Sequence, residues 1–542
     1  MTSSSSTARP PDTRRLVGIP SDERFAGLSA EALELVREGG RHLTMSRVDE
    51  AERALRSALA LAPDHPEALR LMATVEHKRG RLPEAIALLK RANARQPDDP
   101  LVLHHLGASL MQAGQLPVAL PMLRRACELA PDLGSAWMNL GTALDMAGLY
   151  EESEGAFQRA VQCDPNYVPA HIAHGNSLRA IGRVTAAVEE YRRALALNPD
   201  SIGAWAALTD FKTIKFTPED IAELTRLRNH PQRSARDRAI LGFALGKGLE
   251  DQQRYAEALA MFHEANAGWR GLSPKWDRDG FTGFVDRIMD AFVQPPAGAP
   301  DRTLGREIIF VVSLPRSGST LTEQILSAHS EVEGAGERHE LPIVLEEESR
   351  RRGSEFPAWV ADATPEDWER LGRRYLELTA RWRQRKPRST DKALTNWLYI
   401  GAAHAMLPGA RFVNGRRDAL ETALSIYKHL FFLPVPFAYD FEEIGIAWRQ
   451  YDRLMCFWHA HYPGSVYDHV HEELIANPET QVRRLLDFCG LSFERACLRA
   501  HENPRSVATA SAAQVRQPLR GDTAKAHLYG DMLAPLKRSL DL

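Results

Sequence analysis

The first two hundred residues repeat one pattern of small, apolar and turn-forming positions every 34 residues. Small residues suit the point where two helices of a hairpin cross closely, glycine permits the tight turn between them, and proline ends the second helix. The pattern predicts five helical hairpins from about residue 32 to 201, followed by a partial one. The positions in register are Pro63, Pro97, Pro131, Pro165 and Pro199; Gly107, Gly141 and Gly175 between Ala73 and Ala207; Gly80, Gly114, Gly148 and Gly182; and Ala51, Ala85, Ala119 and Ala187.

These hairpins resemble tetratricopeptide repeats, with Trp137 and Trp205 at the aromatic position of the first helix. The resemblance implies a right-handed solenoid whose concave face binds a peptide or protein partner, since each repeat buries its face only on its neighbours. A solenoid that acts only as a spacer or a dimerisation element is the open alternative.

After residue 201 the period fades, but amphipathic stretches at 238–250 and 255–269 predict a further helical hairpin. The Pro/Gly-rich segment 294–300 follows, and helices do not cross such a segment. We therefore expect a disordered N-terminus (1–27), a solenoid (28–225), a helical bridge with a linker (226–300) and a catalytic domain (301–542).

From residue 308 the pattern changes to short β-branched runs that alternate with helices. The candidate strands are 308–313, 411–414 and 466–470, and they predict a parallel α/β sheet. A well-marked helix follows the last strand, with Asn477 as N-cap, Pro478 at its first position and Gly490 as its stop. Ligands of such sheets lie at the carboxyl ends of the strands.

The first of these strands runs straight into the small-residue loop Pro315-Arg-Ser-Gly-Ser-Thr320, which opens a helix. Backbone N–H groups at such a helix start, together with the helix dipole, form a phosphate cradle. The ATP-type P-loop has a glycine where this chain has Ser313 and a lysine where it has Ser319. A nucleotide is therefore expected, but not one whose γ-phosphate is transferred with Mg²⁺; a plain turn is the alternative for the loop alone.

The composition of the chain excludes several classes of function. The 542 residues carry a formal net charge of −3, with charges interspersed, so no basic field indicates nucleic acid or a membrane surface. The five cysteines are scattered and read as ordinary thiols of a reducing compartment. No apolar run approaches the roughly 18 residues that a transmembrane segment needs, and no secretory signal is recognisable at the N-terminus. We expect a soluble, cytoplasmic protein.

Several motifs in order make the C-terminal domain resemble the bacterial tetratricopeptide-repeat sulfotransferases, which are similar in turn to the tyrosylprotein sulfotransferases. The motifs are 314–326, Gly334-Ala-Gly-Glu337, Asp391-Lys392, Arg416-Arg-Asp418 through Ser425-Ile-Tyr427, and 509–518. The resemblance implies a P-loop-like enzyme without a metal. It transfers the sulfuryl group of 3′-phosphoadenosine-5′-phosphosulfate (PAPS) to a hydroxyl, and a protein tyrosine is one such acceptor.

The resemblance also implies a role for each matching residue. The loop residues Pro315, Arg316, Ser317, Gly318, Ser319 and Thr320 would hold the 5′-phosphosulfate, and Arg417 and Ser425 the 3′-phosphate. Glu337 would be the catalytic base, while Lys392 and Ser511 would steady the transferring oxygens alongside Arg316. The competing bases are Glu331, Glu333, Glu340, His329 and His339.

Two positions depart from the family pattern: His471 replaces a tyrosine and His527 a tryptophan, the second in a region that folds over the nucleotide in relatives. Two alternatives stay open, a P-loop kinase-like enzyme and a non-catalytic adaptor with a degenerate nucleotide-binding domain. The kinase alternative lacks a loop lysine and a clear strand ending in a metal-binding aspartate. The acceptor, whether protein, carbohydrate, lipid or small phenol, is not encoded in any motif.

Overall fold

The computed structural model describes residues 23–542 except 212, 273, 432–434, 508 and 510. Most of the N-terminal segment predicted to be disordered lies outside the described residues; within it, Glu23–Phe25 form a short 3-10 helix. The chain divides into two compact units, one of Met1–Ile181 and Thr185–Pro199, the other of Gly182–Val184 and Asp200–Leu542.

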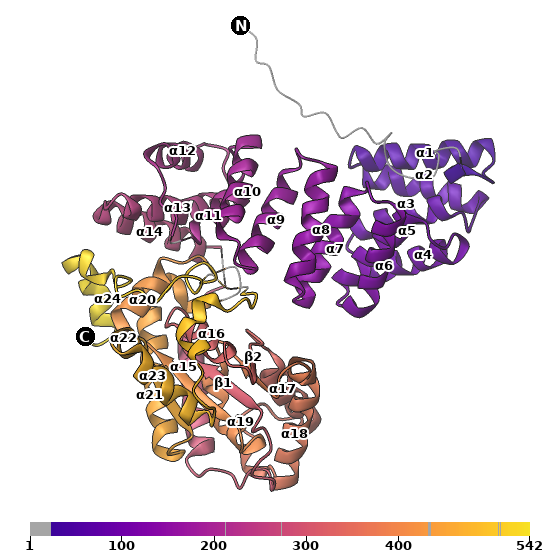
Figure 1. The fold of residues 1–542 in the computed structure, drawn as a ribbon. Coiled ribbons are helices and arrows are strands. Elements are labelled where there is room, and N and C mark those ends of the chain that lie inside the picture. Colours follow the sequence, from indigo (N-terminus) through magenta and orange to yellow (C-terminus); the bar gives the residue numbers. More distant parts are fainter. Residues whose placement is uncertain (1–22, 212, 273, 432–434, 508, 510) are drawn as a thin grey trace. The chain divides into compact units, whose positions relative to one another are not determined.

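The first unit consists of helical hairpins, as the repeat pattern predicts (Figure 1). The turns between paired helices need a left-handed residue, and Gly80, Gly114 and Gly148 supply it with φ of 74°, 72° and 76°. Ser46 takes the same place in the first hairpin with φ 57°. The helix pairs are α1 (Ala30–Thr44) and α2 (Val48–Leu61), α3 (Pro66–Lys78) and α4 (Leu82–Arg95), α5 (Pro100–Gln112) and α6 (Leu116–Leu129), α7 (Gly134–Ala147) and α8 (Tyr150–Cys163), and α9 (Val168–Ala180) and α10 (Val184–Leu197).

Within each of these hairpins the helices cross at a small residue. A Cβ on Gly141 would lie 2.6 Å from the ring of Phe157, so only glycine lets that ring lie against the first helix. The same contact recurs in the second unit between Gly246 of α13 (Ala235–Asp251) and Phe262 of α14 (Tyr255–Arg270), again 16 residues apart (141 to 157, 246 to 262). The predicted hairpin at 238–269 therefore has the crossing geometry of the repeats without their period.

The second unit starts with helices that precede its sheet: α11 (Ile202–Thr209), α12 (Pro218–Arg228), α13, α14 and α15 (Arg278–Phe292). Trp205 of α11 lies 5.9 Å, ring to ring, from Phe216, and the Phe216 amide donates to Asp251 Oδ2 at 3.0 Å. Residues 200–225, which the sequence pattern assigned to the solenoid, therefore pack with α13 in the unit that contains the sheet.

The sheet is five-stranded and parallel, with the order β2-β3-β1-β4-β5, so the predicted α/β class is confirmed. Its strands are β1 (Ile308–Val312), β2 (Val332–Glu333), β3 (Arg388–Asp391), β4 (Arg411–Arg416) and β5 (Val466–Val470). The three strands expected from β-branched runs are β1, β4 and β5. The pattern gave no sign of β2, which has two residues, or of β3, which is the polar Arg-Ser-Thr-Asp.

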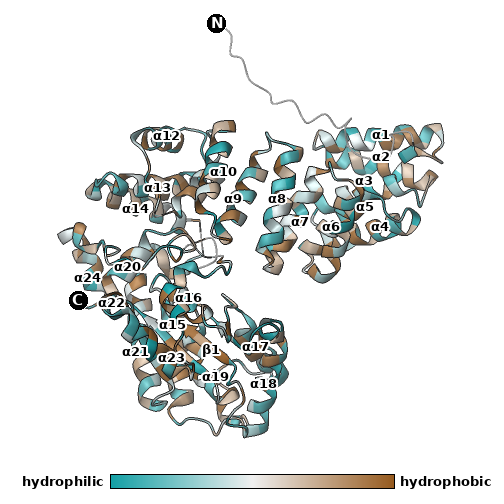
Figure 2. Ribbon diagram, in the orientation of Figure 1, coloured by the Kyte–Doolittle hydropathy of each residue, from teal (hydrophilic) through white to brown (hydrophobic). Residues whose placement is uncertain are grey.

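Strand β1 is buried on both faces, which explains its uninterrupted apolar run (Figure 2). Phe310 and Val312 face one core together with α15, α17 (Glu340–Arg352), α18 (Pro365–Leu378), α19 (Ile400–Met406) and α21 (Phe441–His461). Ile309 and Val311 face the other core with α16 (Ser319–Ser327), α23 (Pro478–Phe488) and the 3-10 segment η7 (Arg495–Glu502). The helix predicted after Asn477 is α23, although the Asn477 side chain makes no capping hydrogen bond.

None of the helices within the described parts of the chain combines the length and the apolar character that a membrane crossing requires.

Candidate functional site

The carboxyl ends of the five parallel strands lie along one edge of the sheet, and most of the predicted site residues follow these ends. Glu337 follows β2, Lys392 follows β3 directly, and the loop 313–318 follows β1. Arg417 follows β4, and His471 follows β5 at the start of α22 (His471–Ala476). Ser425 and Ser511 come from elsewhere, the first from α20 (Ala419–Tyr427) and the second from the segment that follows η7.

The loop after β1 has the backbone of an anion cradle. Gly318, with φ 99°, is the N-cap of α16, and Arg316 is left-handed with φ 68°. This conformation leaves the first N–H groups of α16 without carbonyl partners of their own helix, as at any helix start. Ser317 Oγ donates to the Leu314 carbonyl at 2.8 Å and so closes the loop, whereas Ser319 and Thr320 begin the helix.

Arg316 gathers two of the other predicted residues around the loop. Its Nε donates to Ser425 Oγ at 3.3 Å and its Nη1 to Ser511 Oγ at 3.2 Å. Within the described residues its guanidinium forms no salt bridge. Burial, helped by Arg417 and opposed by Asp210, lowers the pKa of Arg316 to about 10. A guanidinium held by two neutral hydroxyls retains its full charge for an anionic ligand.

Arg417 lies close enough to Arg316 to affect its pKa and is itself only 12 % exposed. Its Nη2 makes long contacts of 3.4 Å to Glu421 Oε2 and to the Thr523 carbonyl. Its Nε is buried and has no hydrogen-bond partner in the described parts of the chain. Arg417 therefore has donor capacity left beside the loop, while Ser425, its predicted partner, accepts from Arg316.

The predicted base and lysine form an ion pair. Lys392 Nζ donates to Glu337 Oε1 at 2.8 Å, and the lysine side chain is 1 % exposed while the glutamate is 31 % exposed. The Lys392 amide also donates to the Gly336 carbonyl at 3.0 Å, so the strand end and the loop are joined twice. Glu337 is thus reachable from solvent, and the ammonium beneath it holds its carboxylate in place.

His329 has both ring nitrogens occupied. The ring is fully buried, Nδ1 accepts from the Glu331 amide at 3.1 Å, and Nε2 lies 2.9 Å from the Ser492 carbonyl. It therefore packs between segments and does not have a nitrogen available for catalysis. Among the other competing bases, Glu331 and His339 are exposed and Glu333 lies 3.8 Å from Arg385.

The sequence analysis found no clear strand that ends in a metal-binding aspartate; the structure contains a strand that ends in an aspartate, and protein donors bind the oxygens of that aspartate. Asp391 closes β3, is fully buried, and accepts from Tyr375 OH at 2.6 Å and Asn396 Nδ2 at 2.9 Å. Burial raises the pKa of Asp391 to about 7. Its oxygens hold the turn that leads into Lys392, because Asp391 Oδ1 also accepts from the Ala393 amide at 3.3 Å.

The two departures from the family pattern lie in different surroundings. His471 is next to the loop, since a Cβ on Gly318 would be 3.5 Å from its Nδ1. Burial and the adjacent Arg417 lower the pKa of His471, so its ring is neutral at neutral pH. His527 is exposed on the short 3-10 helix Ala526–Leu528, whose Ala526 amide is held by Glu421 Oε1 at 2.6 Å.

Glu250 of α13 is a residue that sequence reasoning missed. It is buried and accepts from Lys428 Nζ at 2.6 Å, from Tyr529 OH at 2.6 Å and from Lys525 Nζ. Burial alone would raise the pKa of Glu250, but Lys428 and Lys525 lower it to about 2. No local signal identifies this residue, because its partners lie far along the chain.

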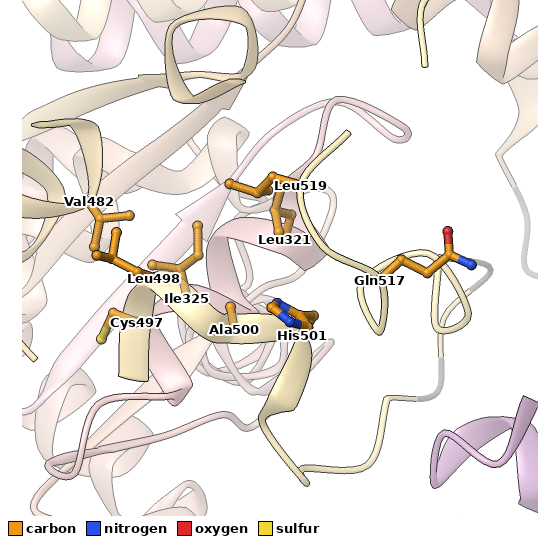
Figure 3. Close-up of a pocket in the computed structure, with 9 residues that line it drawn as sticks. All are labelled: Leu321, Ile325, Val482, Cys497, Leu498, Ala500, His501, Gln517 and Leu519. Atoms are coloured by element: carbon orange, nitrogen blue, oxygen red, sulfur yellow. The ribbon is translucent and has the colours of Figure 1, made fainter. Parts of the chain in front are cut away.

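The apolar pocket in Figure 3 contains none of the predicted site residues. It lies between Leu321 and Ile325 of α16 and the side chains of η7, with Val482, Gln517 and Leu519 completing its wall. Its lining helps to pack α16 against η7, while the loop at the start of α16 carries the polar site.

All five cysteines are free thiols whose pKa is raised by burial, which agrees with the expectation of ordinary thiols. In the described part of the chain, no three His, Cys, Asp or Glu side chains are grouped as metal ligands would be.

The amino-acid sequence was compared with models of known protein families. Residues 308–495 match the model of the sulfotransferase family, and residues 42–106, 106–168 and 168–211 match models of tetratricopeptide repeats. The range that matches the sulfotransferase family holds all five strands of the sheet. It includes the loop after β1, Glu337, Lys392, Arg417 and Ser425, whereas Ser511 lies beyond it.

Two curated relatives illustrate the range of similarity. A protein of Aquifex aeolicus (strain VF5), whose name assigns no activity, is 32% identical over 344 residues, which are 60% of this chain and 44% of the relative. The chain thus spans less than half of that relative's length. A "Putative protein-tyrosine sulfotransferase" of Caenorhabditis briggsae is 29% identical over 203 residues, 36% of this chain and 70% of the relative.

Solved structures match the repeats. MamA (41-end) from Desulfovibrio magneticus RS-1 is 23% identical and covers 32% of this chain and 99% of its own, with a TM-score of 0.29. YrrB, described as a tetratricopeptide-repeat protein with an unusual peptide-binding site, is 22% identical and covers 33% of this chain and 91% of its own, with a TM-score of 0.28.

Glu250→Gln should destabilise the second unit by about 3 kcal/mol at pH 7, because it leaves the nearly buried Lys428 without a carboxylate. The ordinary glutamate pKa is about 4.3, and the folded protein lowers the pKa of Glu250 to about 2. Its contribution is therefore complete above about pH 4.5 and is lost as the pH falls towards 2. Urea denaturation from pH 7 to pH 3 should show the two unfolding free energies converging.

The matched control is Glu257→Gln on α14, since Glu257 forms only an exposed pair with Arg254. This variant should unfold like the wild type at each pH. A Glu250→Gln difference that stays constant from pH 7 to pH 3 would contradict the assignment of the low pKa to Glu250.

Proposed function

We propose that the second unit is a sulfotransferase that uses PAPS as donor and transfers its sulfuryl group to an acceptor hydroxyl. The observation that carries the proposal is the guanidinium of Arg316, which lies in an anion cradle and, within the described part of the chain, is hydrogen-bonded to two hydroxyls and paired with no carboxylate. The match of residues 308–495 to the sulfotransferase family supports it.

The residues present fit the donor's two anionic ends. Arg316, the hydroxyls of Ser319 and Thr320 and the first N–H groups of α16 would bind the 5′-phosphosulfate. Arg417, with its unpartnered buried Nε, would bind the 3′-phosphate together with Ser425. Because Arg316 donates to Ser425, the two ends of the donor site share one hydrogen-bonded group.

The donor supplies the sulfuryl group. As the acceptor oxygen bonds to sulfur, the bond between sulfur and the 5′-phosphate oxygen breaks, and its electron pair stays on that phosphate oxygen. The transition state resembles that of phosphoryl transfer, so position and charge dominate catalysis. Glu337 would take the proton of the acceptor hydroxyl from the exposed side of its ion pair. Lys392 has two N–H bonds beyond the one to Glu337 and would direct them at the transferring oxygens.

A protein tyrosine is the first acceptor to test, because two Caenorhabditis relatives are named for that reaction. Carbohydrate and small phenolic acceptors are the alternatives, and a cytoplasmic location is part of the proposal. A kinase-like activity would appear as MgATP turnover, which the proposal excludes.

The desulfated nucleotide 3′-phosphoadenosine-5′-phosphate (PAP) should bind far more tightly than ADP, which lacks the 3′-phosphate. Arg417→Ala should weaken PAP binding by roughly 10- to 100-fold, since a hydrogen bond to a charged group contributes about 1.5–3 kcal/mol, and should leave ADP binding nearly unchanged. Titration calorimetry measures both affinities.

The neighbouring Arg416→Ala is the control for that measurement. Arg416 is paired with Asp452 at 2.6 Å, so its loss should not alter the ratio of PAP to ADP affinity. If the wild type bound PAP and ADP with equal affinity, the assignment of the 3′-phosphate site would be wrong.

Glu337→Gln keeps the shape of the side chain but removes its basicity. Turnover of PAPS with a tyrosine peptide or a small phenol should fall by about two to four orders of magnitude. The Kd for PAP should change by less than about 3-fold, because the cradle is built from other residues. Glu340→Gln, at a competing carboxylate three positions later, should retain activity; loss of activity only in Glu340→Gln would move the base there.

The tetratricopeptide repeats are proposed to recruit a peptide or protein acceptor. A chain that starts at Asp200 keeps the second unit apart from Gly182–Val184, whereas a cut at 225 would also remove α11 and most of α12. It should bind PAP like the full chain. Its KM should rise for a protein acceptor and not for a small phenol, since remote contacts are available only to the larger substrate. An unchanged ratio of kcat/KM for the two acceptors would leave the repeats as a spacer or a dimerisation element.

A further inference from the structure

Glu323 on α16 is a buried carboxylate to which the proposed chemistry assigns no role. Its side chain is 1 % exposed. Oε1 accepts from the Gly336 amide at 2.8 Å and from Thr390 Oγ1 at 2.7 Å, and Oε2 accepts from Arg505 Nη2 at 2.8 Å. One carboxylate thus joins α16 to three segments that are distant in the sequence.

Two of these partners lie one and two positions before proposed catalytic residues. Gly336 precedes Glu337, and its carbonyl accepts from the Lys392 amide at 3.0 Å. Thr390 ends two positions before Lys392, and its hydroxyl also accepts from the Ala335 amide at 3.1 Å. Glu323 therefore holds two segments next to their reactive side chains. One is the loop 334–337, here called the base loop because it carries Glu337, and the other is β3, which leads into Lys392.

The third partner, Arg505, also holds the start of the loop that carries Glu337. Arg505 Nε donates to the Gly334 carbonyl at 2.9 Å, and its Nη1 donates to Gln324 Oε1 at 3.1 Å. Arg505 consequently joins that loop to α16 through both Glu323 and Gln324.

The charge of Glu323 is maintained by its surroundings. Burial by itself raises its pKa, but Arg505, Lys392 and the hydrogen bonds from Thr390 and Gly336 lower it below the ordinary value. An isolated glutamate at this depth would be strongly destabilising. The alternative hypothesis is that the Glu323–Arg505 ion pair has a structural role alone and attaches the C-terminal segment to the sheet.

We propose that Glu323 is a positioning residue that sets the Glu337–Lys392 pair relative to the donor loop on the same helix. This inference rests on the proposed sulfotransferase function. It predicts that loss of the charge displaces the base and the lysine while the cradle of Arg316, Arg417 and Ser425 stays intact, because none of those three side chains contacts Glu323.

Glu323→Gln is the variant that tests it. With PAPS and a tyrosine peptide or a small phenol, kcat should fall by about 10- to 100-fold, the range expected when reacting groups are misplaced by up to about 1 Å. The Kd for PAP should change by less than about 3-fold. In a Glu337→Gln background the same substitution should lower kcat by clearly less than it does in the wild-type background, since the part of its effect that acts through Glu337 is already lost. A full additional loss in that background would overturn the proposal.

Glu348→Gln provides a structural control. Glu348 is equally buried at 1 % exposure and binds Arg351, Arg352 and Arg370, with no contact to the base loop. It should lower the Tm without changing kcat at temperatures where the protein is folded. If it lowered kcat as much as Glu323→Gln, general loss of stability would explain both effects, and the positioning role would be rejected.

Hydrogen exchange gives a readout that needs no activity. Amides of 332–337 should exchange faster in Glu323→Gln, while those of α23 stay protected. If the wild type transfers no sulfuryl group and the exchange result holds, the proposed function fails and the anchoring of the loop stands. Unchanged exchange at 332–337 would reject the anchoring itself. Arg505→Lys keeps the positive charge but loses the separate guanidinium N–H groups that reach Gly334, Gln324 and Glu323. It should show the same changes to a smaller extent. This variant provides the test if Glu323→Gln does not fold.

Discussion

Strand β1 pairs in parallel with both β3 and β4, and the position of every proposed site residue depends on that pairing. Phe310 is in register with Asp391 of β3 and with Phe412 of β4. This register brings the loop 313–318, Lys392 and Arg417 to the same edge of the sheet. Phe310 and Phe412 stack at 5.2 Å, so side-chain packing reinforces the register. A one-residue shift would exchange the two faces of β1 between its two cores and move the cradle away from its partners.

The buried charges at this edge are unequally compensated. Glu337 is matched by Lys392 and Glu323 by Arg505, so the base loop is electrostatically complete. Among the described residues, Arg316 donates to the hydroxyls of Ser425 and Ser511, and Arg417 makes long contacts of 3.4 Å to Glu421 and to the Thr523 carbonyl. Because a desolvated cation is costly without an anion, the unmatched charge lies where an anionic donor would stabilise the site most.

The hairpin α13–α14 shares the crossing geometry of the repeats but belongs to the unit with the sheet. Asn266 donates to the Tyr427 carbonyl at 2.9 Å, and His263 lies 2.6 Å from Tyr427 OH. Tyr427 ends the helix that carries Ser425. Through these contacts, and through Glu250, the hairpin supports one wall of the proposed donor site, so a repeat-like element is here a component of the unit that contains the sheet.

The sequence alone determined the five hairpins, the turn glycines, the α/β class, three strands and the loop between β1 and α16. Each of these signals is local: Gly80 at positive φ or the buried run of β1 is encoded within a few residues. Only the tertiary structure revealed β2 and β3, the occupied nitrogens of His329 and the partners of Arg316, Glu250 and Glu323. Arg316 meets Ser511 across 195 positions, and Glu323 meets Arg505 across 182. Such contacts are selected by packing and by the need to pair buried charge, and neither requirement leaves a periodic pattern along the chain.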